Sequence, residues 1–270
     1  YLASEGDILL NKVDSLAEMH TDDAVYGNVR IKSAKSIYGL DKSDTGDTTH
    51  VGGVNVLLEA GSGTIGESSD SEDVKAKKHS DRIILSNKRA VTARSGKDMK
   101  LAHTGKFFVD SLYSPGNIDI TGKNGVQLAY QSDGNTSNIA GSLHMQGAIE
   151  KTKTPVAAVS GMNVAMTTAA PVTDDNTIGT KENPLSVYTG DGAQADADTD
   201  IYLKGSNLGL LIDNVDAGSH KVVIDGYKGD VLTNGKAEKA DIIAKEVNIT
   251  NASNIGVGGT KTYTTDANGK

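Results

Sequence analysis

Short segments in which apolar and polar side chains alternate recur along most of the chain. Each is about four to six residues long, and the residues between them are rich in Gly, Asp, Asn, Ser and Thr. Alternation is typical of a β-strand that buries one face, and the intervening residue types favour turns. The sequence therefore predicts an all-β fold. The clearest strands are Asn28–Ile31, Val54–Leu58, Asn117–Ile120, Gly125–Leu128 and Lys221–Ile224.

One segment has a helical pattern. Between Asp7 and His20, apolar residues at positions 8, 9, 13, 16 and 19 would line one face of a helix. The beginning of the same segment, Gly6–Leu10, reads equally well as a short strand. The sequence leaves both interpretations open.

A strand-opening motif recurs. A glycine is followed within one or two residues by Asp or Asn and then by Ile or Val, and the first two gaps are 21 and 26 residues (6 to 27, then 27 to 53). Such spacing is typical of solenoids, whose repeats span about 20–50 residues. The motif begins at Gly6, Gly27, Gly53, Gly116, Gly161 and Gly229.

A longer module also repeats, with Gly63–Gly66, Asn176–Gly179 and Ser253–Gly256 as equivalent ends. This divides a single elongated domain, residues 1–270, into imperfect modules of about 1–66, 67–179 and 180–256. Two polar loops, Gln131–Asn138 and Thr167–Asn176, would absorb the unequal spacing.

A parallel β-helix explains these repeats physically. One short strand with a single apolar face cannot offset its ordering entropy, whereas stacked coils pair equivalent strands and form a continuous apolar column. The expected fold is a parallel β-helix decorated by loops. The alternative is a pair of tandem β-sandwich domains.

Composition narrows the classes of function. Apolar residues make up 37 % and aromatic residues 4 %, which suits a thin aliphatic core. The net charge of −8 disfavours nucleic acid as a partner, and the lack of cysteine excludes disulfides and thiolate metal sites. No apolar stretch approaches the ~20 residues of a membrane helix. The chain starts at Tyr1 without a signal-peptide pattern, and we expect both ends to be cuts through a longer polypeptide.

Candidate chemistry is sparse, and we expect no catalytic, cofactor or metal site. The six histidines lack metal-ligand spacing and are expected on the surface: His20, His50, His79, His103, His144 and His220. The segment Asp41–Asp47 resembles a calcium loop but has Gly52 where an acidic ligand is needed. If the segment is extended, Asp196, Asp198 and Asp200 would share one face and could attract Ca²⁺. A solvated acidic loop is the favoured interpretation.

Two further groups of residues are candidates for a functional role. The Lys228-Gly229-Asp230 triplet resembles an integrin-binding tripeptide, but opening a strand already explains it. Parallel β-helices also include polysaccharide lyases and hydrolases, which need converging carboxylates. Neighbouring coils could bring Asp119, Asp225 and Asp230 together, so such an enzyme is the alternative function.

The sequence resembles filamentous-haemagglutinin-like adhesins, in particular the giant leukotoxin-type filamentous adhesins. The segments that carry this resemblance are Gly53–Gly66, Asn183–Val187, Asp200–Gly205 and Leu208–Leu211. The resemblance implies a right-handed β-helical shaft, exported by type V secretion and displayed on the outer surface of a Gram-negative bacterium. The family supplies no catalytic residues.

The expected function is thus that of a structural and adhesive shaft segment in a giant extracellular or cell-surface filamentous adhesin. Expected partners are neighbouring modules of the same chain, a glycan or protein on host or bacterial cells, and other shafts through lateral self-association.

Overall fold

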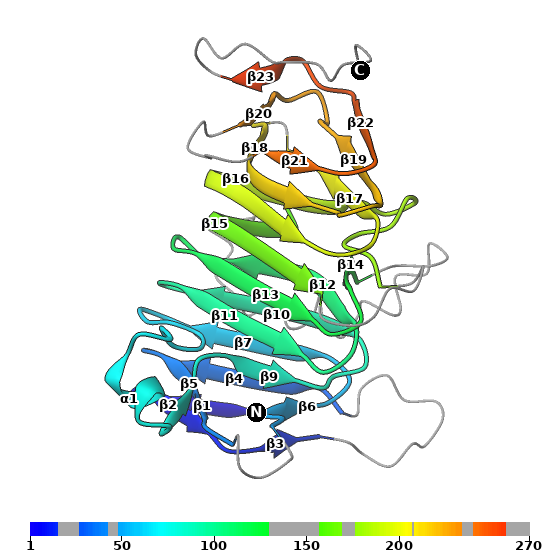
Figure 1. Cartoon of the computed structure of the whole chain (residues 1–270). Helices are drawn as coiled ribbons and strands as arrows, with labels where there is room; N and C mark the ends of the chain where they lie inside the picture. The colour runs from blue at the N-terminus through cyan, green and yellow to red at the C-terminus, as the bar shows by residue number, and fades with distance from the viewer. Residues whose placement is uncertain are drawn as a thin grey trace.

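The computed structural model describes residues 1–15, 27–42, 48–129, 157–168, 176–206, 208–233 and 240–257. These residues are all-β apart from one short helix, and most of their strands belong to a single 20-stranded sheet that curls around a buried interior (Figure 1). Every strand pairing described in that sheet is parallel, and the chain runs from the N-terminal end to the C-terminal end of the stack. This arrangement is compatible with a β-helix. The alternative of tandem β-sandwich domains is wrong for the described residues, because a β-sandwich has antiparallel sheets and this sheet is parallel.

Equivalent strands stack in three ladders. The first contains β1 (Leu2–Ser4), β4 (Val29–Ser33), β7 (Val56–Ala60), β10 (Ala90–Ser95), β12 (Phe107–Tyr113), β15 (Val159–Thr168) and β16 (Leu185–Asp196). The second contains β3 (Val13–Asp14), β6 (Val51–Gly52), β9 (Ile83–Leu85), β11 (Met99–His103), β13 (Ile118–Gly122), β15, β16, β18 (Leu210–Asp216) and β21 (Ile242–Ile243).

The third ladder joins the start of β12 to β14 (Val126–Leu128) and, through a bridge at Ile178, to β17 (Ile201–Lys204), β19 (Lys221–Asp225) and β22 (Glu246–Thr250). Beyond it, β20 (Val231–Thr233) and β23 (Ile255–Val257) stack on β18. A small second sheet contains β2 (Ile8–Leu10), β5 (Ile37–Leu40) and the antiparallel β8 (His79–Ser80).

The shortest coils have 18 or 19 residues, since Ile83 pairs with Leu101 and Leu101 with Ile120. Other coils are longer because insertions interrupt them. One insertion, residues 66–82, includes the helix α1 (Glu72–Lys75). Ser71 is the N-cap of this helix, and its side chain accepts a hydrogen bond from the amide of Val74 at 3.1 Å. This insertion decorates the stacked core. Of the two loops that the sequence predicted, Gln131–Asn138 lies outside the described residues, as do residues 169–175 of Thr167–Asn176.

The interior consists of columns of apolar side chains that follow one another from coil to coil. In the first column, Ile31, Leu58, Ala93, Leu112, Val159 and Val187 are successive register partners, and all are fully buried. In the second column, Ile37, Ile65, Met99, Ile118 and Val164 follow one another in the same way. The predicted continuous apolar interior is confirmed.

The strand-opening motif has a structural reason. Its Asn or Asp side chain bonds to the equivalent side chain one coil away: Asn55 Nδ2 donates to Asn28 Oδ1 at 2.8 Å, and Asn163 Nδ2 donates to Asn117 Oδ1 at 2.8 Å. Near the C-terminal end, Asn254 Nδ2 donates to Asp230 Oδ1 at 2.8 Å. Each polar position thus ties two coils together beside the backbone ladder.

For the segment from Asp7 the sequence left a helix and a strand open. Within its described part, up to residue 15, the segment contains β2 and β3, so the strand interpretation of Gly6–Leu10 is confirmed for Ile8–Leu10. One expectation about the strand-opening motif was wrong. Gly161 does not open a strand: it lies inside β15, where the register with β16 shifts by one residue between Gly161 and Asn163. A pattern of residue types cannot distinguish a strand start from such a bulge, because both favour glycine.

Candidate functional site

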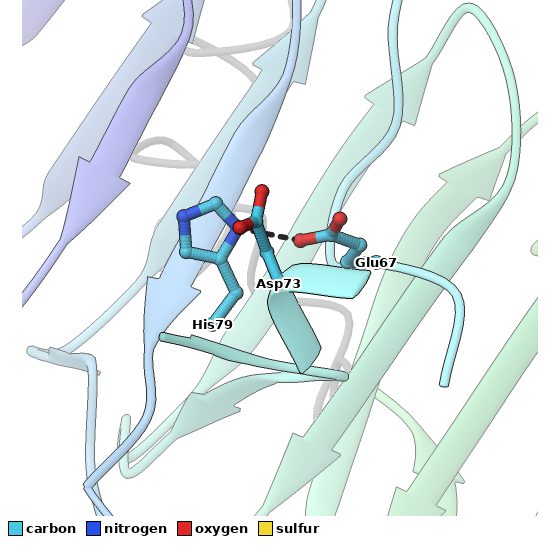
Figure 2. Close-up of side chains that lie close together, drawn as sticks. All are labelled: Glu67, Asp73 and His79. Carbon is cyan, nitrogen blue, oxygen red and sulfur yellow. Dashed lines mark hydrogen bonds and ion pairs between the residues drawn. The ribbon is translucent and has the colours of Figure 1, made fainter. Parts of the chain in front are cut away.

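The insertion at residues 66–82 brings one histidine and two carboxylates together on the outside of the stack. Glu67 follows the buried bridge residue Ile65, Asp73 lies in the first turn of α1, and His79 lies in β8 (Figure 2). One ligand atom of each side chain lies within 4.8 Å of the other two. Among the described residues, these three alone form such a group of potential metal ligands.

Contacts around the cluster hold it in place. His79 Nδ1 and Glu67 Oε2 are 2.6 Å apart, and these two side chains are only 17 % and 16 % exposed. The imidazole stacks on the ring of Tyr38 in β5, with ring centroids 5.0 Å apart. The backbone amide of Glu67 donates to the carbonyl of Asp81 at 2.9 Å, which closes the base of the insertion. Lys78 Nζ lies 3.2 Å from Asp73 Oδ1.

Little in the sequence pattern indicates this cluster. Asp73 and His79 are 6 residues apart and Glu67 and His79 are 12 apart, which matches no local ligand motif. A helical turn and an antiparallel strand pairing create the proximity.

Two histidines are buried, so the expectation that all six lie on the surface was wrong. His50 is completely buried: its Nδ1 accepts a hydrogen bond from the amide of Ile84 at 2.9 Å, and its Nε2 lies 2.8 Å from the carbonyl of Leu40. His103 is 7 % exposed. Its Nε2 lies against the carbonyl of Asn87, and its Nδ1 accepts a hydrogen bond from the amide of Gly105.

Both imidazoles therefore satisfy backbone groups where the coil turns. His220 is partly exposed and lies 3.8 Å from Asp198. His20 and His144 lie outside the described residues.

Burial has an electrostatic consequence at His103. Removal of the ring from water lowers the pKa of His103, because a charged imidazolium is poorly solvated there; the two backbone hydrogen bonds oppose this only in part. His103 is therefore suited to a neutral, structural role.

The acidic segment from the end of β16 alternates between outward-facing and buried residues. Asp196, Asp198 and Asp200 point outward, whereas Ala195, Ala197 and Thr199 between them are buried. In the described part of the chain these carboxylates do not form a three-ligand group. Of the calcium-loop-like segment, Asp41 is described, and its amide donates to the carbonyl of Lys78 at 3.1 Å; residues 43–47 lie outside the described residues.

Asp200 belongs to a small polar network with Tyr202 and Lys221. Lys221 Nζ is 3.2 Å from Asp200 Oδ2, and the Tyr202 hydroxyl donates to the same oxygen at 3.0 Å. The hydrogen bond with Tyr202, together with that to Asp200, raises the pKa of Lys221 to about 12. Burial alone would raise the pKa of Asp200, but hydrogen bonds from Lys221 and Tyr202 lower it overall. The network keeps Asp200 and Lys221 charged and joins β17 to β19.

The three carboxylates of the alternative enzyme have separate partners. Asp119 in β13 makes a bidentate pair with Arg82, at 2.7 and 2.8 Å. Asp225 ends β19 and accepts from Asn251 Nδ2 at 3.1 Å, while Asp230 accepts from Asn254. Asp119 and Asp225 lie in different ladders. The fold does not bring the three together.

The Lys228-Gly229-Asp230 triplet lies in the turn between β19 and β20. Tyr227 and Lys228 both have positive φ angles, of 49° and 64°, and the amide of Gly229 donates to the carbonyl of Gly226 at 2.9 Å. The triplet thus forms a tight turn that leads into Val231, in agreement with its predicted strand-opening role.

Comparison with known proteins adds no family assignment. No protein-family model matches the chain, and neither curated proteins nor solved structures match it. Within the described residues, none of the helical structure has the length and apolar character needed to span a membrane.

Proposed function

We propose that this chain is a structural and adhesive shaft segment of a giant filamentous surface protein, built as a right-handed parallel β-helix. The observation that carries the proposal is the continuity of the ladders: strand follows strand in parallel register from β1 to β22, around columns of aliphatic side chains. Each parallel step advances the stack by roughly 4.8 Å, so added coils lengthen a rod without changing its cross-section.

The polar side chains support a mechanical role. Asn28 and Asn55, Asn117 and Asn163, and the pair of Arg82 with Asp119 all connect strands or turns of different coils. Bonds that repeat along the stack resist shear between coils.

The C-terminal coil supports the proposal that neighbouring modules are partners. Val222 is fully buried beneath Val247, but Val247 itself is 47 % exposed, and Ile255 in β23 is 58 % exposed. These side chains occupy the same column positions that are covered in every interior coil. A further coil stacked on β22 and β23 would bury them, because it would continue the ladders.

The proposed location is the outer surface of a Gram-negative bacterium, reached by type V secretion. The insertion at 66–82 shows how loops project from the shaft, and such loops are the proposed contacts with glycans or proteins of other cells. Lateral association between shafts belongs to the same proposal.

Immunogold electron microscopy of the source bacterium, with antibodies raised against this segment, tests the function. Gold along fibres that extend from the cell is the expected result. Label found only on free protein in the medium would contradict the shaft and favour the secreted polysaccharide lyase or hydrolase instead.

A further inference from the structure

We propose that Glu67, Asp73 and His79 bind a divalent transition-metal cation of the zinc class, which fastens the insertion at residues 66–82 to the β-stack. This inference goes beyond the shaft function and does not depend on it.

The geometry of the three ligand atoms suits one cation. Zinc binds nitrogen and carboxylate oxygen at about 2.0–2.2 Å, so its tetrahedral ligands lie roughly 3.3–3.5 Å apart. In the structure the His79 and Glu67 ligand atoms are 2.6 Å apart, and all three atoms lie within 4.8 Å of one another. Small side-chain rotations therefore bring them to ligand spacing. Figure 2 shows the carboxylates of Asp73 and Glu67 on the Nδ1 side of the imidazole.

The donor set selects the kind of cation. An imidazole nitrogen suits zinc and related transition metals, whereas calcium and magnesium prefer oxygen ligands throughout. Two carboxylates balance the charge of a divalent ion. Three protein ligands leave the fourth tetrahedral position to water.

The surroundings orient the ligands and offer little competition. Tyr38 stacks on the imidazole and fixes its plane, so Nδ1 keeps facing Glu67. Lys78 is the cation now beside Asp73, but this ion pair is exposed, at 68 % and 47 % for the two side chains. Exposed pairs are weak, so a divalent ion can displace the ammonium group.

The ligands come from three separate segments: Glu67 follows the positive-φ Gly66, Asp73 lies in the first turn of α1, and His79 lies in β8. α1 has only four residues and no buried side chain, so packing contributes little to holding it. A shared cation would join α1 to both sides of the insertion, because a metal that binds the folded form stabilises it.

Isothermal titration calorimetry with zinc chloride tests the site. The wild-type chain is expected to bind one zinc ion with higher affinity than any other site on the protein. Glu67→Gln, Asp73→Asn and His79→Gln should each weaken this binding at least about tenfold. His220→Gln is the matched control, since His220 is also a partly exposed histidine beside a carboxylate, Asp198, and it should bind zinc like the wild type.

Hydrogen exchange supplies a readout that mere loss of folding cannot imitate. Zinc should slow amide exchange in residues 67–80 of the wild type and the His220→Gln variant, but not in the His79→Gln variant. Circular dichroism should show the same strand content in all four variants. Unchanged zinc affinity in both His79→Gln and Glu67→Gln would overturn the proposal, as would calcium binding that equals zinc binding and survives His79→Gln.

Discussion

Gly66 and Gly179 end equivalent short segments, Thr64–Gly66 and Thr177–Gly179. In each segment a fully buried isoleucine makes parallel bridges to the coils on both sides, and the glycine then takes a positive φ, of 77° and 69°. A β-carbon at Gly66 would lie 2.7 Å from the carbonyl oxygen of Lys100, and one at Gly179 would lie 2.7 Å from the amide nitrogen of Leu185. Glycine is required here for both its backbone conformation and its lack of a side chain.

Gly179→Ala should therefore destabilise the chain by about 2 kcal/mol or more, because the left-handed conformation alone costs an alanine about 1–2 kcal/mol. Urea unfolding followed by circular dichroism measures the loss. Gly105→Ala is the control: Gly105 lies between β11 and β12, where a β-carbon would make only ordinary contacts at 3.6 Å with His103. An equal loss in both variants would refute the backbone explanation.

His103 makes stability depend on pH. Its pKa is lowered in the folded state, so between the folded and unfolded pKa values the unfolded chain binds more protons. Stability from this group is complete above about pH 6.5 and is lost as the pH falls below it. The free energy of unfolding should decrease from pH 7.5 to pH 5.5, and this decrease should be larger for the wild type than for His103→Gln. Equal decreases would show that His103 does not contribute.

At the scale of the elements, Asn55 shows how one side chain connects three coils. It opens β7, is 3 % exposed, donates to Asn28 below, and accepts a hydrogen bond from the amide of Ala90 at 3.2 Å above. The sequence motif marked Asn55 only as a strand-opening residue. Its second bond was not predictable, because β10 begins 35 residues later, beyond the insertion that contains α1.

Asn55→Ala should cost about 2 kcal/mol, because it leaves the buried amide of Ala90 without this partner and removes one of the two hydrogen bonds that Asn28 Oδ1 accepts from Asn55. Thermal or urea unfolding measures the effect. Asn163→Ala, at the equivalent but exposed pair with Asn117, should stay within about 0.5 kcal/mol of the wild type. A large loss at Asn163 with none at Asn55 would contradict the role of burial.

At the scale of the whole molecule, each coil contacts mainly the coils before and after it. Stability in such a stack is approximately the sum of terms from each coil and each interface, so coils with one neighbour open first. The strands β11 and β13 lie between coils on both sides and bury Leu101 and Ile120, whereas β22 is mostly exposed.

Hydrogen exchange measured by mass spectrometry should show this gradient. Amides of β11 and β13 should exchange at least about tenfold more slowly than those of β22 and β23, since an opening free energy lower by about 1.4 kcal/mol corresponds to that ratio. Uniform protection from β1 to β23 would instead indicate a single cooperative unit.

The sequence by itself determined the class of fold, the strands and the chemistry of the interior. Alternation marked segments such as β4, β7, β13 and β19, and the recurring Gly with Asn or Asp marked the coil starts, because each coil must solve the same local turning and packing problem. Only the tertiary structure decided which strands pair across insertions, that His50 and His103 lie inside, and that Glu67, Asp73 and His79 meet. The pairings, the buried histidines and the cluster all depend on contacts between residues distant along the chain. Because the lengths of the insertions vary from coil to coil, no local pattern in the sequence indicates which residues meet.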